Sequence, residues 1–173
     1  MPIAWMGLKD YQKKRIMVFL DPNADPSGSG YHILQSKLSI GSGRLLGKGL
    51  YNGNINKHGF LPEKHTDFIF AVLVEELGFL GAGILIFLYF FMLLRCIRIA
   101  KTARDDFGRY LVVGVTCMLM FHIFANIAMT IGLMPVTGKP LPFISYGGTF
   151  MLSNMIAIGI ILNVNMRRDK INF

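Results

Sequence analysis

The stretch FLPEKHTDFIFAVLVEE, residues 60–76, places acids, a lysine and a histidine directly before an uncharged run at 77–94. Charges beside so apolar a segment are costly unless they are paired or used. Asp67 has two interpretations here. It could cap a helix that begins at Phe68, or it could act as a general base in a partly desolvated site at the membrane boundary. The residue pattern alone favours the cap and leaves both interpretations open.

A second candidate site is the glycine-rich stretch GSGRLLGKGL, residues 41–50. Glycines let a backbone approach a ligand closely or adopt positive φ, and Arg44 and Lys48 could then hold an anion such as a phosphorylated lipid head group. The stretch lacks the spacing of a nucleotide-binding P-loop. A flexible loop with solvated cations is the alternative.

The third candidate is PLPFISYGGTF, residues 140–150, where prolines and a Gly-Gly pair interrupt an apolar run. Non-helical backbone at membrane depth is tolerated where it is buried in protein or lines a wet cavity. We expect Lys139 and Ser145 to touch a polar head group there, unless the stretch is only a turn between helices. His122 and Asn126 lie one turn apart in an apolar run and should point into a helix bundle. The histidines show no HExxH or other metal-ligand spacing.

These candidate sites sit in a chain of strongly apolar composition. It is 53% hydrophobic with a mean hydropathy of +0.47, and its net charge of +8 comes from only 16% charged residues. The charges lie between apolar runs, which favours a membrane protein over a nucleic-acid binder. Three uncharged runs, 77–94, 111–133 and 143–164, each reach the ~20 residues that cross a bilayer. The predicted fold is therefore an all-α polytopic membrane protein with three transmembrane helices in 77–173.

Residues 1–76 should form a large loop region with short helices. We expect helices at 10–20 and 31–40, the second with its apolar residues turned inward. The helix that begins near Phe68 should continue through the glutamates at 75 and 76, and glycines beyond them permit a break. The expected inward residues of the second helix are Ile33, Leu34, Leu38 and Ile40.

Basic residues set the expected orientation. They are concentrated in 95–110 and after 164, which the positive-inside rule places in the cytoplasm. Residues 1–76 and 134–142 would then be extracytoplasmic. The chain would begin outside without a signal to carry it there, so we expect a fragment or one half of a larger membrane protein.

The order of these motifs resembles the SEDS family of shape, elongation, division and sporulation proteins. DYQKKR, DPNADPSGSGYHILQSKLSIGSG, GKG, FLPEKHTDFIFAVLVEELGFLG and PLPFISYGG occur in family order between residues 9 and 168. HTDFIF after LPE is most similar to the RodA-like elongation branch. The resemblance implies the C-terminal part of a peptidoglycan glycosyltransferase, a partial SEDS fold that would be inactive alone. Such enzymes polymerise lipid II at the outer face of the bacterial cytoplasmic membrane during cell-wall elongation.

The resemblance also assigns roles to residues. Asp67 matches the family's essential acid and would be the general base, which reverses the preference for a cap. A divalent cation, Mg or Mn, could assist the leaving pyrophosphate, although no metal site is visible. The chain departs from the family pattern at Gly43-Arg44-Leu45 and at Gly53-Asn54-Ile55, which puts fine loop contacts in doubt, those of Arg44 most of all. The expected substrate-binding residues are Lys48, Glu63, Lys64, His65, Arg44 and Ser145.

The implied partners are lipid II, a class B penicillin-binding protein that crosslinks glycan, and other membrane proteins of the elongation complex, with no nucleic acid. Two other functions stay open. A lipid II flippase would need a groove open to both leaflets and no base at Asp67. A noncatalytic scaffold for the crosslinking partner would need partner binding and no lipid II binding.

Overall fold

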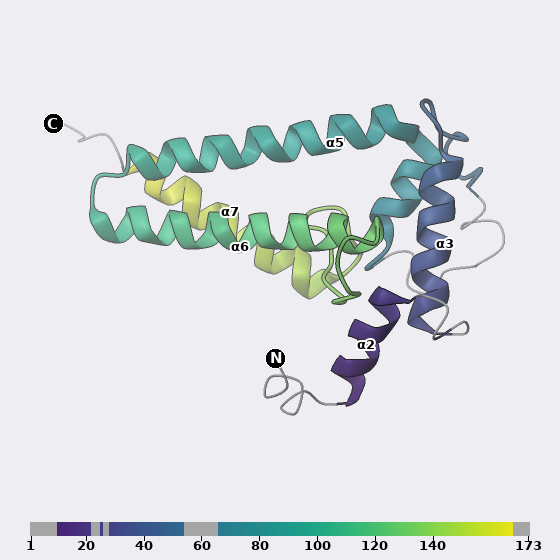
Figure 1. The fold of residues 1–173 in the computed structure, drawn as a ribbon. Helices are drawn as coiled ribbons and strands as arrows, with labels where there is room; N and C mark the ends of the chain where they lie inside the picture. The colour runs from purple at the N-terminus through teal and green to yellow at the C-terminus, as the bar shows by residue number, and fades with distance from the viewer. Residues whose placement is uncertain (1–9, 22–24, 26–27, 54–65, 168–173) are drawn as a thin grey trace, which may run out of the picture.

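The computed structural model describes residues 10–21, 25, 28–53 and 66–167, and this part of the chain contains helices and no strands. Three long helices lie alongside one another, and α3 crosses them at one end (Figure 1). Short α2 packs against α3. The helices are α2 (Asp10–Leu20), α3 (Ser29–Ser42), α5 (Ile69–Lys101), α6 (Asp106–Thr130) and α7 (Gly148–Met166).

The helices α5, α6 and α7 are each long and apolar enough to cross a membrane. Their outward faces expose large apolar side chains such as Phe87, Phe91 and Phe124, as expected where lipid is the solvent. The three spans expected from the sequence are therefore confirmed, although their ends differ. α5 begins earlier and ends later than 77–94, so the expected domain boundary after residue 76 falls inside this helix.

The third span is shorter than the run 143–164 because its first residues are not helical. α7 begins at Gly148, after a tight turn in which the amides of Ile144 and Ser145 donate to the Leu141 carbonyl. Phe143 has a φ of 64° and Gly147 a φ of 156°, and neither angle continues a right-handed helix. Apolar composition extended the predicted helix into a segment that the prolines and glycines keep irregular.

The two ends of the bundle differ in character. At one end α5 passes into α6 through residues 102–105, and α7 ends there as well (Figure 1). A cluster of Cys96, Ala100, Val112 and Ile161 packs the three helices together at this end. At the other end lie α3, the start of α5 and residues 131–147. The basic stretch 95–110 and the stretch 134–142 thus lie at opposite ends, as the sequence predicted.

Helix α3 packs through a different face from the one expected. Ile33 is buried and Ile40 is partly buried, but Leu34 and Leu38 are exposed, so their predicted inward orientation is wrong. Ser36 and Ser39 are buried instead. The reason is a polar contact: Ser36 Oγ donates to the carbonyl oxygen of Thr130, at the end of α6, over 2.8 Å. Small hydroxyl side chains let α3 approach its neighbours closely while still satisfying backbone groups.

α5 is broken at Gly78, one of the positions that the sequence permitted (Figure 1). Gly78 has φ 70° and ψ −170°. An unbroken helix would pair the amides of Phe79 and Leu80 with the carbonyls of Glu75 and Glu76. Here those amides donate to the carbonyls of Arg44 and Leu45, over 2.9 Å and 3.1 Å.

The freed carbonyls find partners in the same loop. The Glu75 carbonyl accepts from the amide of Lys48, and the Glu76 carbonyl accepts from the amide of Gly49, each over 3.0 Å. Two helical hydrogen bonds are thus exchanged for four bonds to the glycine-rich stretch. A helix can break in an apolar setting only where other groups satisfy the freed backbone, and the backbone of residues 44–49 does so here.

Candidate functional site

Asp67 lies in a turn immediately before α5 and does not cap the helix. The helix begins at Ile69 with Phe68 in the cap position, and no side chain bonds to the cap amides. Phe68 takes this position because its ring is buried in a cluster with Ala71 and Val72. The cap interpretation of Asp67 is therefore wrong, because Phe68 and not Asp67 occupies the cap position.

Two buried side chains hold the backbone of this turn. Asn126, on α6, donates from Nδ2 to the Asp67 carbonyl over 2.8 Å. Ser145 donates from Oγ to the Thr66 carbonyl over 2.7 Å. Both side chains are almost fully buried. Consecutive peptide units beside the carboxylate are therefore fixed by residues that are far away in the sequence.

The same two side chains also hold the loop 131–147. Asn126 Nδ2 donates to the Lys139 carbonyl over 2.7 Å, and the Leu141 amide donates to Ser145 Oγ over 2.7 Å. Tyr89, on α5, adds a third anchor by donating its hydroxyl to the Pro142 carbonyl. The Asp67 turn and the Lys139 segment therefore form one fixed unit at this end of the bundle.

The Asp67 carboxylate lies over the bend at Gly138. A Cβ atom added at Gly138 would be 3.3 Å from Asp67 Oδ2, and Gly138 has a φ of 65°. Asp67 itself is partly exposed. Buried side chains hold the turn, and part of the carboxylate is open to solvent. A carboxylate placed in this way can accept a proton from a molecule that binds beside it, as a general base does.

A pocket of about 400 Å³ opens beside this turn. It lies between the first residue of α5 and the first turn of α7, and Ser145 is in its wall. Asp67 is not among the described residues that line this pocket. The pocket is lined by Ile69, Ile144, Ser145, Tyr146, Gly147, Gly148 and Met151. A larger pocket of about 470 Å³ lies between α5 and α6 at the opposite end, away from Asp67.

Ser145 was expected to contact a head group, and the structure shows its hydroxyl already engaged in both directions. Its backbone-holding role is the observed one, and contact with a ligand stays a prediction. Glu63, Lys64 and His65 lie outside the described residues, so their predicted contribution also stays a prediction.

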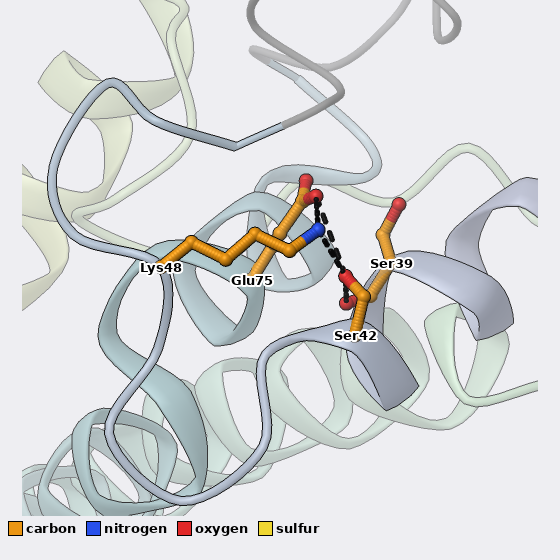
Figure 2. Close-up of polar contacts among 4 residues, drawn as sticks. All are labelled: Ser39, Ser42, Lys48 and Glu75. Atoms are coloured by element: carbon orange, nitrogen blue, oxygen red, sulfur yellow. Dashed lines mark hydrogen bonds and ion pairs between the residues drawn. The ribbon is translucent and has the colours of Figure 1, made fainter.

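The Lys48 ammonium bonds to side chains at the end of α3 and in the first part of α5, as Figure 2 shows. Its Nζ lies 2.8 Å from Glu75 Oε1 and 2.7 Å from Ser42 Oγ. The glycine-rich stretch approaches the break in α5, and Gly43 and Gly47 lie directly against the backbone of that helix. A Cβ added at Gly47 would fall closer than 3.0 Å to the backbone of Glu76. Arg44 is exposed, with a φ of 49°, so the two predicted anion-binding cations differ in their availability.

Sequence reasoning missed two residues of this region. Asn126 was expected to face the bundle, which the structure confirms, but its hold on Asp67 was not foreseen. Glu75 was recognised only as part of a helix, and it is fully buried. Within the described residues no group of three or more His, Cys, Asp or Glu side chains is gathered for a metal ion.

Comparison with known proteins places this geometry in a family. The family model of FtsW, RodA and SpoVE, described as cell cycle proteins, matches residues 1–170. The peptidoglycan glycosyltransferase MrdB of Escherichia coli K12 is 47% identical over 172 residues, which cover 99% of this chain and 46% of MrdB. RodA of Treponema pallidum is 42% identical over 161 residues, which cover 93% of this chain and 37% of RodA. A probable FtsW of Geobacter metallireducens is 43% identical, covering 91% of this chain and 42% of that protein. The chain thus spans less than half the length of these relatives.

Solved structures agree in fold. A chain from a peptidoglycan synthase complex, described as coordinating polymerization and crosslinking, superposes with a TM-score of 0.78 at 32% identity, over 96% of this chain and 45% of that one. An aspartate-to-alanine mutant of RodA from Thermus thermophilus superposes with a TM-score of 0.61 at 33% identity, over 72% of this chain and 38% of that one. The chain is a helical membrane protein that belongs to the FtsW/RodA/SpoVE family, as its SEDS motifs indicated.

Proposed function

We propose that this chain contributes the general base and its supporting frame to a peptidoglycan glycosyltransferase that polymerises lipid II into glycan strands. The observation that carries the proposal is the fixation of the Asp67 turn by Asn126 and Ser145. Catalytic groups act when they are held in productive geometry by buried neighbours. The names of the similar proteins, peptidoglycan glycosyltransferases in each case, support the same activity.

The reaction uses the Asp67 carboxylate as a proton acceptor. The 4-hydroxyl of the acceptor sugar gives its proton to the carboxylate while its oxygen attacks the anomeric carbon of the donor with inversion. The bond from that carbon to the pyrophosphate oxygen breaks, and undecaprenyl pyrophosphate leaves with the electron pair. A pyrophosphate is a good leaving group, so no strong general acid is required.

Cations would stabilise the departing charge. Lys139 is the best placed in the described part, because Asn126 holds its backbone beside that of Asp67. Arg44 is exposed and could approach a head group, whereas Lys48 is committed to Glu75. A divalent ion stays a prediction. The described residues gather no three-ligand cluster for such an ion, and Asp67 is already assigned as the proton acceptor.

We also propose that the Asp67 end of the bundle faces outward from the bacterial cytoplasmic membrane. The cations at 95, 98, 101, 104 and 109 lie at the other end, and short basic loops stay in the cytoplasm. A class B penicillin-binding protein is the proposed partner. It is supported by the fold match to a synthase complex that joins polymerization with crosslinking. Association with other elongation-complex membrane proteins stays a prediction.

The test uses the full-length protein with its partner in lipid vesicles, with purified lipid II as substrate. Asp67→Asn should lower glycan formation by about 10²–10⁴-fold, the usual contribution of a general base, without loss from the membrane. Normal glycan strands from Asp67→Asn would reject the assignment. The 173-residue chain alone should form no glycan.

The same preparation separates the alternatives. Translocation of fluorescent lipid II across the vesicle membrane, with no polymer from the unaltered protein, would indicate a flippase. Partner binding with neither translocation nor lipid II binding would indicate a scaffold.

A further inference from the structure

Neither the proposed reaction nor the crossing of a membrane by α5 accounts for the buried carboxylate of Glu75. It lies in the first part of α5 and is fully buried. Oε1 accepts from the Lys48 ammonium over 2.8 Å and lies 3.4 Å from Ser42 Oγ, whose shorter bond, of 2.8 Å, is to the Ser39 carbonyl (Figure 2). The other oxygen faces buried Gly53, where an added Cβ would lie 3.0 Å from Oε2. The carboxylate thus lies beside the end of α3, Lys48 of the glycine-rich stretch, and Gly53, three residues beyond that stretch.

An ion pair between a fully buried carboxylate and a partly buried ammonium is a poor way to gain stability. Desolvation of two charges offsets much of their attraction, and well-packed apolar side chains often serve as well or better. What such a pair provides is a defined geometry, because both partners must meet at one place with their hydrogen bonds satisfied. The pair therefore points to a need for positional accuracy at this place.

The place is the break in α5. Gly78 interrupts the helix, and residues 44–49 supply all four substitute backbone bonds across the break. A glycine in this conformation does not by itself fix the direction of the helix before it. The docked stretch, anchored by Lys48 on Glu75, fixes the direction of residues 69–77 relative to the rest of α5.

That direction decides where Asp67 lies. Glu75 and Asp67 are eight positions apart, and residues 69–75 between them are one helical segment, so the separation is about 12 Å at 1.5 Å per residue. The pivot at Gly78 lies three residues beyond Glu75, so a tilt of about 5° at the break would move Asp67 by at least ~1 Å. Misplacement by ~1 Å is enough to cost about a hundredfold in rate.

We infer that Lys48 and Glu75 are positioning residues, which act through the first part of α5 to hold Asp67 in its reactive place. The inference rests on the proposed function. It assigns Lys48 a role different from the anion contact that the sequence suggested, and it gives Glu75 a role for the first time.

The experiment compares Lys48→Met, Lys48→Arg and the double variant Lys48→Met/Glu75→Gln in the full-length protein with its partner, using lipid II. The matched control is Lys101→Met, an exposed lysine at the far end of the same helix. Lys48→Met removes the ammonium from a fully buried carboxylate and could fail to fold, whereas the double variant carries neither charge and keeps the test valid. Polymerisation rates are measured against lipid II concentration, and backbone hydrogen exchange is measured across α5 and α6.

We expect the double variant to fold and to lose about tenfold to a hundredfold in kcat, with KM changed less than about twofold, as for an interaction made through the catalytic group. Lys48→Arg should restore most of the rate, because it keeps the charge. Hydrogen exchange should rise in 66–77 and stay unchanged in α6. Lys101→Met should match the unaltered protein in every measurement.

Two results would overturn the inference. A double variant with unchanged kcat and unchanged exchange in 66–77 would show that the pair only fills space. A raised KM with unchanged kcat would make Lys48 a substrate ligand. Asp67→Asn, run alongside, keeps the failures apart: if it polymerises normally the proposed base is wrong, whereas if it is inactive and the double variant is normal only the positioning role is wrong.

Discussion

Asn126 and Asp67 are joined by a hydrogen bond from the Asn126 side-chain amide to the Asp67 backbone carbonyl, over 2.8 Å. The same nitrogen donates to the Lys139 carbonyl over 2.7 Å. Both partners are acceptors only, so the NH₂ group must face them and the orientation of the amide is determined. A fully buried residue in the membrane helix α6 thereby connects the segment of the candidate base with the segment of a candidate cation.

Replacement of Asn126 by leucine should damage both stability and activity. Leucine has a similar size but no donor, so two partly buried carbonyls would lose their donor, at a cost of about 0.5–1.5 kcal/mol for each hydrogen bond. We expect a lower midpoint of thermal unfolding in detergent and a loss of at least tenfold in lipid II polymerisation, because Asp67 would no longer be fixed.

Asn163→Leu provides the control for that experiment. Asn163 is exposed near the end of α7, away from Asp67, so its replacement should leave both measurements unchanged. An Asn126→Leu protein with the unfolding midpoint and rate of the unaltered protein would show that the two carbonyl contacts do not hold the site.

Ser145→Ala should have an effect of the same kind but smaller. The substitution removes an acceptor for the Leu141 amide, in a buried bond, and a donor to the Thr66 carbonyl, in a partly buried bond. It should lower the free energy of unfolding by about 1–3 kcal/mol. Ser153→Ala is the matched control, since Ser153 is exposed and bonds only within its own helix. If Ser145→Ala raises KM for lipid II while stability is unchanged, the predicted head-group contact is correct and the backbone-holding role is minor.

Features that depend on residues close together along the chain could be predicted from the sequence. The three membrane helices follow from long uncharged runs, and α2 has the predicted bounds, residues 10–20. The break in α5 falls at Gly78, among the glycines that permitted one. Each of these depends on residues that are neighbours along the chain, so composition and turn chemistry suffice.

Features that depend on distant partners could not be predicted. Phe68 displaced Asp67 from the cap position because of a buried cluster that includes Val136 among its neighbours. Ser36 turned inward because a carbonyl at the end of α6 needed a donor. Lys48 was read as a ligand because nothing near it in sequence indicated its pairing with Glu75. A local pattern shows which kinds of bond a side chain can make, and only the fold shows which residue it bonds to.

The glycines at the break give the last prediction. Gly47 and Gly78 have φ of 76° and 70°, and a Cβ added at either would fall closer than 3.0 Å to backbone of the other segment. Gly47→Ala and Gly78→Ala should each lower the free energy of unfolding by more than the ~1–2 kcal/mol of left-handed strain alone, because the clash is with backbone that cannot move aside. The melting temperature in detergent measures this.

Gly83→Ala, also in α5, is the control, because an added Cβ there meets nothing within 4 Å. Alanine is favoured over glycine inside a helix by about 1 kcal/mol, so this variant should be as stable as the unaltered protein or slightly more so. The comparison also shows whether Gly47 is required for contact with a lipid head group or for packing against the backbone of α5. If they admit a lipid head group, Gly47→Ala should raise KM and leave the melting temperature unchanged. If they admit the backbone of α5, as the structure has it, the melting temperature should fall whether or not lipid II is present.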